Sequence, residues 1–225
     1  MIWQGDSNRR VRVPVDGTEV EGDLEFPEQP LGIVVFAHGS GSSRRSPRNR
    51  HVARMLREAG LATVLIDLLT REEDRDGSLR FDIPFLADRV GAITGWIRDE
   101  VAPEELRVGV FGASTGAAAA LRASADRAGE VAAIVSRGGR PDLAGEALSR
   151  VEAPTLLIVG SDDEPVTSLN LAAYAGIRAP KEISIIPGAT HLFEEPRALD
   201  RVALLAAGWF RRFLPLSPPN RPPVR

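Results

Sequence analysis

The residue with the clearest chemical potential in this sequence is Ser114. It stands in Gly112-Ala113-Ser114-Thr115-Gly116, which fits the pattern G-x-S-x-G. An apolar run at residues 108–111 precedes this pattern and an alanine-rich segment follows it, so the pattern predicts a strand, a sharp turn and a helix. Such a turn pushes the serine hydroxyl out of the sheet, and the first helical turn aims free N–H groups toward it. The serine is therefore a candidate nucleophile with part of an anion-stabilising site beside it.

Two other interpretations of this turn are open from its residues alone. The serine could simply cap the helix that follows, which is a common role for serine. The turn could also hold a dinucleotide, because FGASTGAAA resembles a loose glycine fingerprint. That site needs an acidic residue at the end of the next strand, but the strand expected at residues 131–135 is followed by Ser136 and Arg137. The sequence therefore favours the nucleophile over the nucleotide site.

A serine hydroxyl is a poor nucleophile until a base takes its proton, and the chain has three histidines that could do so. His191 follows the last expected strand directly, in the loop at residues 187–191, and can reach over the carboxyl end of a sheet. His38 lies in a glycine-rich loop after an early strand, and His51 lies within a predicted helix. We therefore predict that His191 is the base.

A carboxylate is needed to hold the tautomer of the base and to stabilise its charged form. Asp162, Asp163 and Glu164 follow the strand expected at residues 155–160, and their spacing alone leaves the choice among them open. The resulting chain order is serine, acid, histidine, which is the order expected when a doubly wound sheet carries such a triad.

These motifs resemble the α/β-hydrolase superfamily and, within it, the small lidless serine hydrolases similar to dienelactone hydrolases. The resemblance runs from the first hairpin to the last helix. It is carried by VFAHGSGS at residues 35–42, the serine turn at 112–116, VGSDDEPV at 159–166 and PGATHLF at 187–193. It implies that these motifs carry, in that order, the first oxyanion-hole amide, the nucleophile, the acid and the base.

The resemblance also implies individual roles. The backbone N–H groups of Ser40 and Thr115 are expected to form the oxyanion hole, and the spacing of the family's acid motif favours Asp163 over Asp162. His38 is expected to shape its loop. Dienelactone hydrolases carry a cysteine nucleophile, whereas this chain contains no cysteine. The serine therefore points to a general ester as the substrate.

Strands and helices alternate along the chain, which predicts an α/β fold. The expected architecture is a doubly wound, mostly parallel sheet with helices on both faces, led by an antiparallel hairpin around Asp16 and Gly17. The polar stretch at residues 68–80 is expected to be a surface loop. The short link between the strands that end near Ser136 and Gly160 leaves no room for a cap domain.

We expect one domain at residues 1–214 and a proline-rich tail at 215–225. Strands are predicted at 10–15, 18–25, 32–37, 62–66, 108–111, 131–136, 155–160 and 181–186, and helices at about 48–59, 84–97, 167–175 and 199–213.

Composition limits the classes of partner that this protein is expected to bind. The chain has 225 residues and a net charge of −3, so it offers no strong positive field to nucleic acid or to an anionic membrane. Its first residues, MIWQGDSNRR, lack the apolar core of a signal peptide, and no apolar run is long enough to cross a membrane. We expect a cytoplasmic protein that acts on a small molecule, without a nucleic-acid or membrane partner. The oligomeric state is left open.

The function predicted from the sequence is hydrolysis of small carboxylic esters through Ser114, His191 and Asp163, by way of an acyl-enzyme and without a metal or cofactor. A thioesterase or another acyl-transfer hydrolase on the same triad is the first alternative, and a binding protein of the same fold without turnover is the second. Arg137 and Arg140, expected just past the end of a strand, are candidates for contact with a carboxylate or phosphate on the substrate.

Overall fold

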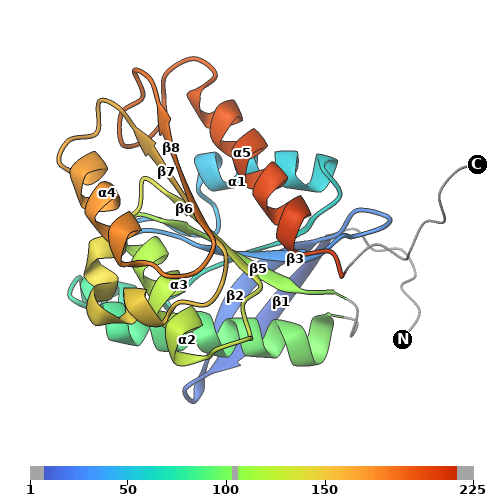
Figure 1. Cartoon of the computed structure of the whole chain (residues 1–225). Coiled ribbons are helices and arrows are strands. Elements are labelled where there is room, and N and C mark those ends of the chain that lie inside the picture. Colours follow the sequence, from blue (N-terminus) through green and yellow to red (C-terminus); the bar gives the residue numbers. More distant parts are fainter. Residues whose placement is uncertain (1–7, 103–105, 217–225) are drawn as a thin grey trace, which may run out of the picture.

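The computed structural model describes residues 8–102 and 106–216. In this part of the chain, eight strands form one sheet in the order β1-β2-β4-β3-β5-β6-β7-β8. β2 is antiparallel to both of its neighbours, and the strands from β4 to β8 are parallel, as the sequence predicts (Figure 1). The strands are β1 (Asn8–Val15), β2 (Thr18–Glu25), β3 (Ile33–Ala37), β4 (Ala62–Ile66), β5 (Val108–Ala113), β6 (Ala133–Arg137), β7 (Thr155–Gly160) and β8 (Lys181–Ile186).

Helices cover both faces of the sheet, which explains why the central strands are apolar on both sides. α1 (Pro47–Glu58) and α5 (Ala198–Phe213) lie together on one face, where Val52, Leu56, Val202 and Phe210 belong to one buried core. α2 (Ile83–Trp96), α3 (Thr115–Asp126) and α4 (Val166–Gly176) cover the other face over a second core. A single π-helical turn, Ile97–Val101, continues α2, and a 3-10 segment at Pro141–Arg150 is interrupted at Gly145.

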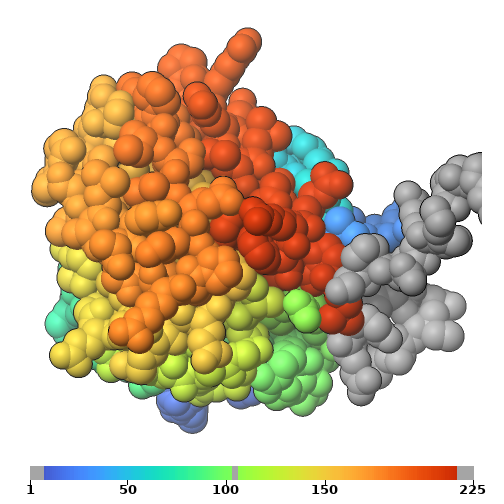
Figure 2. Space-filling view, viewed as in Figure 1, coloured from blue at the N-terminus to red at the C-terminus, as the bar shows by residue number. Residues whose placement is uncertain are grey.

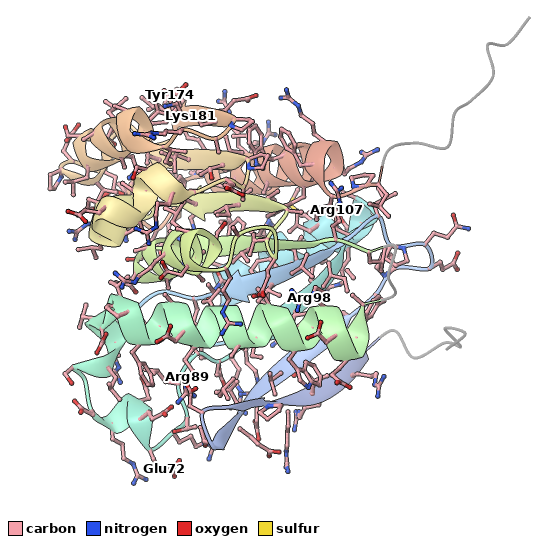
Figure 3. The ribbon with its side chains drawn as sticks, turned by 60° about the horizontal axis from the view of Figure 1, so that its bottom comes forward. Glu72, Arg89, Arg98, Arg107, Tyr174 and Lys181 are labelled. Atoms are coloured by element: carbon pink, nitrogen blue, oxygen red, sulfur yellow. The ribbon has the colours of Figure 1, made fainter. Side chains whose placement is uncertain are left out.

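The stretch after β4 lies mostly at the surface, as predicted, but its start is buried and part of it is helical. Leu68 and Leu69 are buried, and two short 3-10 helices follow, Glu73–Arg75 and Leu79–Phe81. Arg89 of α2, labelled in Figure 3, anchors this stretch to the domain. Its buried guanidinium forms ion pairs with Glu73 at 2.5 Å and with Asp16 of the β1–β2 turn at 3.1 Å. The many charged residues of this stretch suggested an exposed loop, so the burial of Leu68 and Leu69 and the ion pairs of Arg89 were not predicted.

β5 ends two residues later than the predicted 108–111, and β6 ends at Arg137, one residue beyond the predicted 131–136. In the ladder, Ala113 pairs with Arg137, and Arg137 pairs in turn with Ile158 of β7. Arg137 is therefore the last residue of a buried strand, and the expectation that it lies in a loop is wrong. Ser136 and Arg137 are polar, so the sequence did not indicate that the buried strand continues to Arg137.

The carboxyl ends of the parallel strands meet at one rim. The chain passes from β3 to β4 on one side and returns to β5 on the other, so the loops after β3 and β5 flank a topological switch point, where ligands collect in open α/β sheets. Figure 2 shows the surface in the same view as Figure 1, where the carboxyl-terminal half, yellow to red, forms most of the visible face. None of the helices in the described ranges has the length and apolar character that a membrane span requires.

Candidate active site

Ser114 occupies a strained turn between the last residue of β5 and the first residue of α3. Its φ is +51° and its ψ is −122°, a backbone conformation that residues other than glycine rarely adopt. The two glycines of the motif make this turn possible. A Cβ on Gly112 would lie 2.5 Å from the Cα of Ala117, and a Cβ on Gly116 would lie 2.2 Å from the carbonyl oxygen of Ala37. Neither position can accept a side chain without a shift of backbone.

The predicted acid and base are in contact. His191 Nδ1 lies 2.8 Å from Asp163 Oδ2, and the Asp163 side chain is only 9% exposed. Asp162 is exposed, and its carboxylate accepts a hydrogen bond from the neighbouring Ser161 hydroxyl. Of the two carboxylates that the sequence left open, Asp163 is therefore the one that touches the imidazole. When Nδ1–H donates to this carboxylate, Nε2 keeps a lone pair that can accept a proton.

Close backbone packing holds the acid and base loops together. A Cβ on Gly160 would lie 2.0 Å from the carbonyl oxygen of Ala189, so the loop after β7 and the loop after β8 touch through their main chains. The Asp162 N–H donates to this same Ala189 oxygen at 3.0 Å, and the Gly188 N–H donates to Ser161 Oγ at 2.7 Å. Contacts just before each residue thus hold the loops of Asp163 and His191 close together.

The turn after β6 lies between Ser114 and His191. On one side, the Ser114 N–H donates to the carbonyl oxygen of Arg137 at 3.4 Å, and the Arg140 N–H donates to the Ser114 carbonyl oxygen at 3.1 Å. On the other side, a Cβ on Gly138 would lie 3.5 Å from His191 Nδ1. Within the described residues, the Ser114 hydroxyl forms no hydrogen bond with His191. Contacts of this kind often tighten only when substrate binds.

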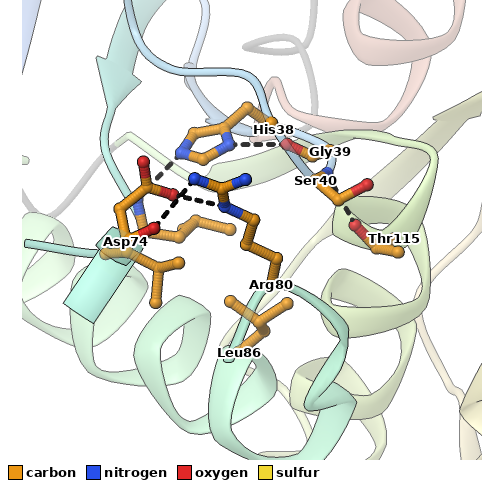
Figure 4. Close-up of a pocket in the computed structure, with 10 residues that line it drawn as sticks. His38, Gly39, Ser40, Asp74, Arg80, Leu86 and Thr115 are labelled. Carbon is orange, nitrogen blue, oxygen red and sulfur yellow. Dashed lines mark hydrogen bonds and ion pairs between the residues drawn. The ribbon is translucent and has the colours of Figure 1, made fainter. Parts of the chain in front are cut away.

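The loop after β3 approaches the serine closely. A Cβ on Gly39 would lie 2.9 Å from Ser114 Cβ, and the Ser40 N–H donates to Thr115 Oγ1 at 3.0 Å. Ser40 and Thr115, the residues expected to form the oxyanion hole, thus lie side by side (Figure 4). They line a small hollow whose apolar wall is formed by Leu68, Leu69 and Leu86. The sequence motif indicated a role only for the Thr115 backbone N–H and not for its hydroxyl. The hydroxyl could have been considered, because threonine carries a polar group that can form hydrogen bonds.

His38 has no free nitrogen with which to act as a base. Its Nε2 accepts the Leu68 N–H at 3.0 Å, and its Nδ1 bonds the Gly39 carbonyl oxygen at 3.0 Å (Figure 4). Burial lowers the pKa of His38, so the ring is neutral and ties its own loop to the stretch after β4. His51 lies between α1 and α5, where its Nε2 is 2.6 Å from an Asp200 oxygen.

The two arginines considered for substrate contact have different surroundings. Arg137 is buried, donates to Asn49 Oδ1 at 3.2 Å and lies over the Phe193 ring at 5.8 Å. Burial lowers the pKa of Arg137 to about 10. Arg140 is partly exposed and forms two hydrogen bonds with Asp142, at 2.8 and 2.9 Å. Neither side chain lines the hollow beside Ser40, and a substrate contact by either one stays a prediction.

Comparison with known proteins identifies a family. The model of the "Dienelactone hydrolase family" matches residues 20–213. The chain belongs to this family. A dienelactone hydrolase from Anabaena variabilis is 52% identical and has a TM-score of 0.89, with 93% of this chain and all of that chain covered. A lidless α/β serine hydrolase from Xanthomonas campestris shares the fold at 20% identity and a TM-score of 0.77, with 95% and 98% covered.

Curated relatives from Mycobacterium tuberculosis carry a different name. They are called "Putative phosphoribosyl transferase" and are 55% identical over 203 residues. The match covers 90% of this chain but only 46% of each relative, so the chain spans less than half of their length.

Proposed function

We propose that this chain is a serine hydrolase that cleaves small carboxylic esters through Ser114, His191 and Asp163. The observation that carries the proposal is the 2.8 Å contact between His191 and a buried Asp163, on the rim where the strained turn presents Ser114. A base oriented by a carboxylate, next to a raised serine, is the arrangement that activates a hydroxyl for acyl transfer.

The proposed mechanism uses these residues as follows. His191 Nε2 takes the Ser114 proton while Ser114 Oγ bonds to the ester carbonyl carbon, and Asp163 stabilises the imidazolium that forms. Backbone N–H groups at Ser40 and Thr115 bind the developing oxyanion. The imidazolium then gives its proton to the leaving alcohol as the carbon–oxygen bond breaks. Water repeats the sequence on the acyl-enzyme, which releases the carboxylic acid and restores Ser114.

The small size of the hollow beside Ser40 is the basis for an expected preference for short acyl groups. Its wall is formed by Leu68, Leu69 and Leu86, and the Asp74–Arg80 ion pair stands at its edge (Figure 4). An apolar recess next to the oxyanion site suits the alkyl part of an ester rather than a charged group. We therefore expect acetyl and propionyl esters to be better substrates than long-chain esters.

A substrate panel tests the proposal. Purified protein is assayed with p-nitrophenyl esters of increasing acyl length, with matched thioesters and with amides, and we expect the short esters to have the highest kcat/KM. Ser114→Ala should abolish turnover. Ser124→Ala, which removes another buried serine hydroxyl of α3, should keep it. A chain that prefers thioesters would be a thioesterase on the same site, and activity retained by Ser114→Ala would refute the proposed role of this serine.

The transferase name of the mycobacterial relatives adds a control to this panel. Those proteins are more than twice as long as the matched region, so their name does not have to describe it. We expect no diphosphate release from a phosphoribosyl diphosphate donor under conditions that give ester hydrolysis. Release that survives Ser114→Ala would point to a second activity.

A further inference from the structure

The hydroxyl of Thr115 faces the loop that carries the other predicted oxyanion-hole donor, Ser40. Its oxygen accepts the backbone N–H of Ser40 at 3.0 Å, so one predicted oxyanion-hole donor points at this hydroxyl in the free protein. The Thr115 residue is only 4% exposed, yet it lines the same hollow as Ser40 and Gly41 (Figure 4). The hydroxyl is thus part of the wall against which an ester carbonyl would lie.

The bond to Ser40 leaves the hydroxyl proton unused. Within the described part of the chain, the only hydrogen bond of this side chain is the one it accepts from Ser40. A hydroxyl can accept and donate at once, and accepting an N–H polarises its own O–H, which then donates more strongly. Thr115 is also the first residue of α3, where the partial positive charge of the helix N-terminus favours a nearby anion.

We propose that the Thr115 side chain is a catalytic donor of the oxyanion site. In this arrangement, which rests on the proposed esterase function, the Ser40 N–H holds the hydroxyl in place and the Thr115 O–H donates to the oxyanion as it forms. The Thr115 backbone N–H donates to the same oxygen. This changes one step of the mechanism above: the oxyanion is bound by two donors of Thr115, and the Ser40 N–H orients the Thr115 hydroxyl instead of binding the oxyanion itself.

The opposite effect of the same contact is a definite alternative. If the hydroxyl only competed with the substrate for the Ser40 N–H, its removal would free that donor and the reaction would become faster. The two effects therefore predict changes of opposite sign for one substitution. Thr115→Val keeps the shape of the side chain and removes the hydroxyl, which makes it the informative variant.

The experiment compares kcat and KM for p-nitrophenyl acetate in wild type, Thr115→Val and Thr115→Ser. We expect Thr115→Val to lower kcat by about 10- to 100-fold with little change in KM, because an oxyanion donor acts mainly in the transition state. Thr115→Ser, which restores the hydroxyl, should recover most of the lost rate. Thr155→Val is the matched control, since it removes a buried threonine hydroxyl at the opposite end of the sheet.

A second readout separates catalysis from folding. Affinity for a boronic acid, which forms a tetrahedral adduct on a reactive serine, should fall in Thr115→Val by a factor similar to the loss of kcat. An unchanged or higher kcat in Thr115→Val refutes the inference, and so does an equal loss in Thr115→Ser. If wild type reacts with neither esters nor a fluorophosphonate, the proposed function fails and takes this inference with it. A reactive wild type with an unaffected Thr115→Val overturns the inference alone.

Discussion

Asp163→Asn tests the role of the acid without changing the size of the side chain. The carboxylate is buried and accepts the His191 Nδ1–H at 2.8 Å. An amide at this position can instead donate its own N–H to Nδ1, which moves the ring proton to Nε2. In that tautomer the imidazole cannot accept the Ser114 proton.

The expected loss is large because the base is held in the wrong tautomer. A comparable substitution in serine proteases costs about four orders of magnitude in kcat. Here the His191 side chain is 38% exposed and has more freedom to reorient, so we expect a loss of at least about 1,000-fold, equivalent to about 4 kcal/mol in the transition state. The measurement is kcat/KM for p-nitrophenyl acetate, with the melting temperature as a check on folding.

The chain offers a matched control next to this residue. The Asp162 side chain is exposed, and within the described residues it bonds only to the neighbouring Ser161 hydroxyl, so Asp162→Asn should keep kcat/KM within about twofold. An Asp163→Asn variant that keeps more than about a tenth of the activity would refute the assignment of the acid. An equal loss in Asp162→Asn would show that the loop as a whole, rather than the contact to His191, is what matters.

The remaining predictions concern stability, pH and substrate size. Gly116→Ala should lower the free energy of unfolding by at least about 3 kcal/mol, because the new Cβ meets the Ala37 carbonyl oxygen. Gly208→Ala, in open space on α5, should raise it by about 0.4–1 kcal/mol. Urea unfolding measures both changes. Burial lowers the pKa of His38 in the folded state, so the unfolded chain binds more protons than the folded chain as the pH falls from about 7 to 5. Wild type should therefore lose more free energy of unfolding over this range than His38→Gln. Equal slopes of the free energy of unfolding against pH in the two proteins would contradict this prediction. Leu86→Ala should enlarge the hollow and raise the ratio of hexanoyl to acetyl ester kcat/KM by at least about fivefold, and an unchanged ratio would place the acyl group elsewhere.

The succession of strands along the chain and the positions of the site motifs after them could be predicted from the sequence. The parallel strands other than β8 are short, largely apolar runs that end at or just before glycine or a polar residue, and the turn around Ser114 carries glycines that the observed backbone requires. These signals are local, so they can be read without knowledge of the packing. The antiparallel hairpin could also be predicted, because an Asp-Gly pair favours the positive φ angles that a tight hairpin turn needs. Asp16 and Gly17 both have positive φ in the structure.

The features that were missed depend on contacts between distant residues. The stretch after β4 carries many charges, and only the ion pairs of Arg89 and the burial of Leu68 show that it packs on the domain. The burial of Arg137 likewise depends on Asn49 and Phe193, which lie far from it in the sequence. No periodicity or motif predicts such partners, and the rotamer that brings Thr115 Oγ1 to Ser40 belongs to the same class.

The most direct test of the central claim is covalent labelling by a fluorophosphonate, followed by peptide mapping. An activated serine displaces fluoride and forms a stable phosphonate ester, while an ordinary serine does not react. We expect one label per chain, on Ser114, lost in Ser114→Ala and strongly slowed in Asp163→Asn. A chain that remains unlabelled, or a label on another serine, would contradict the account of Ser114 as a nucleophile activated by His191 and Asp163.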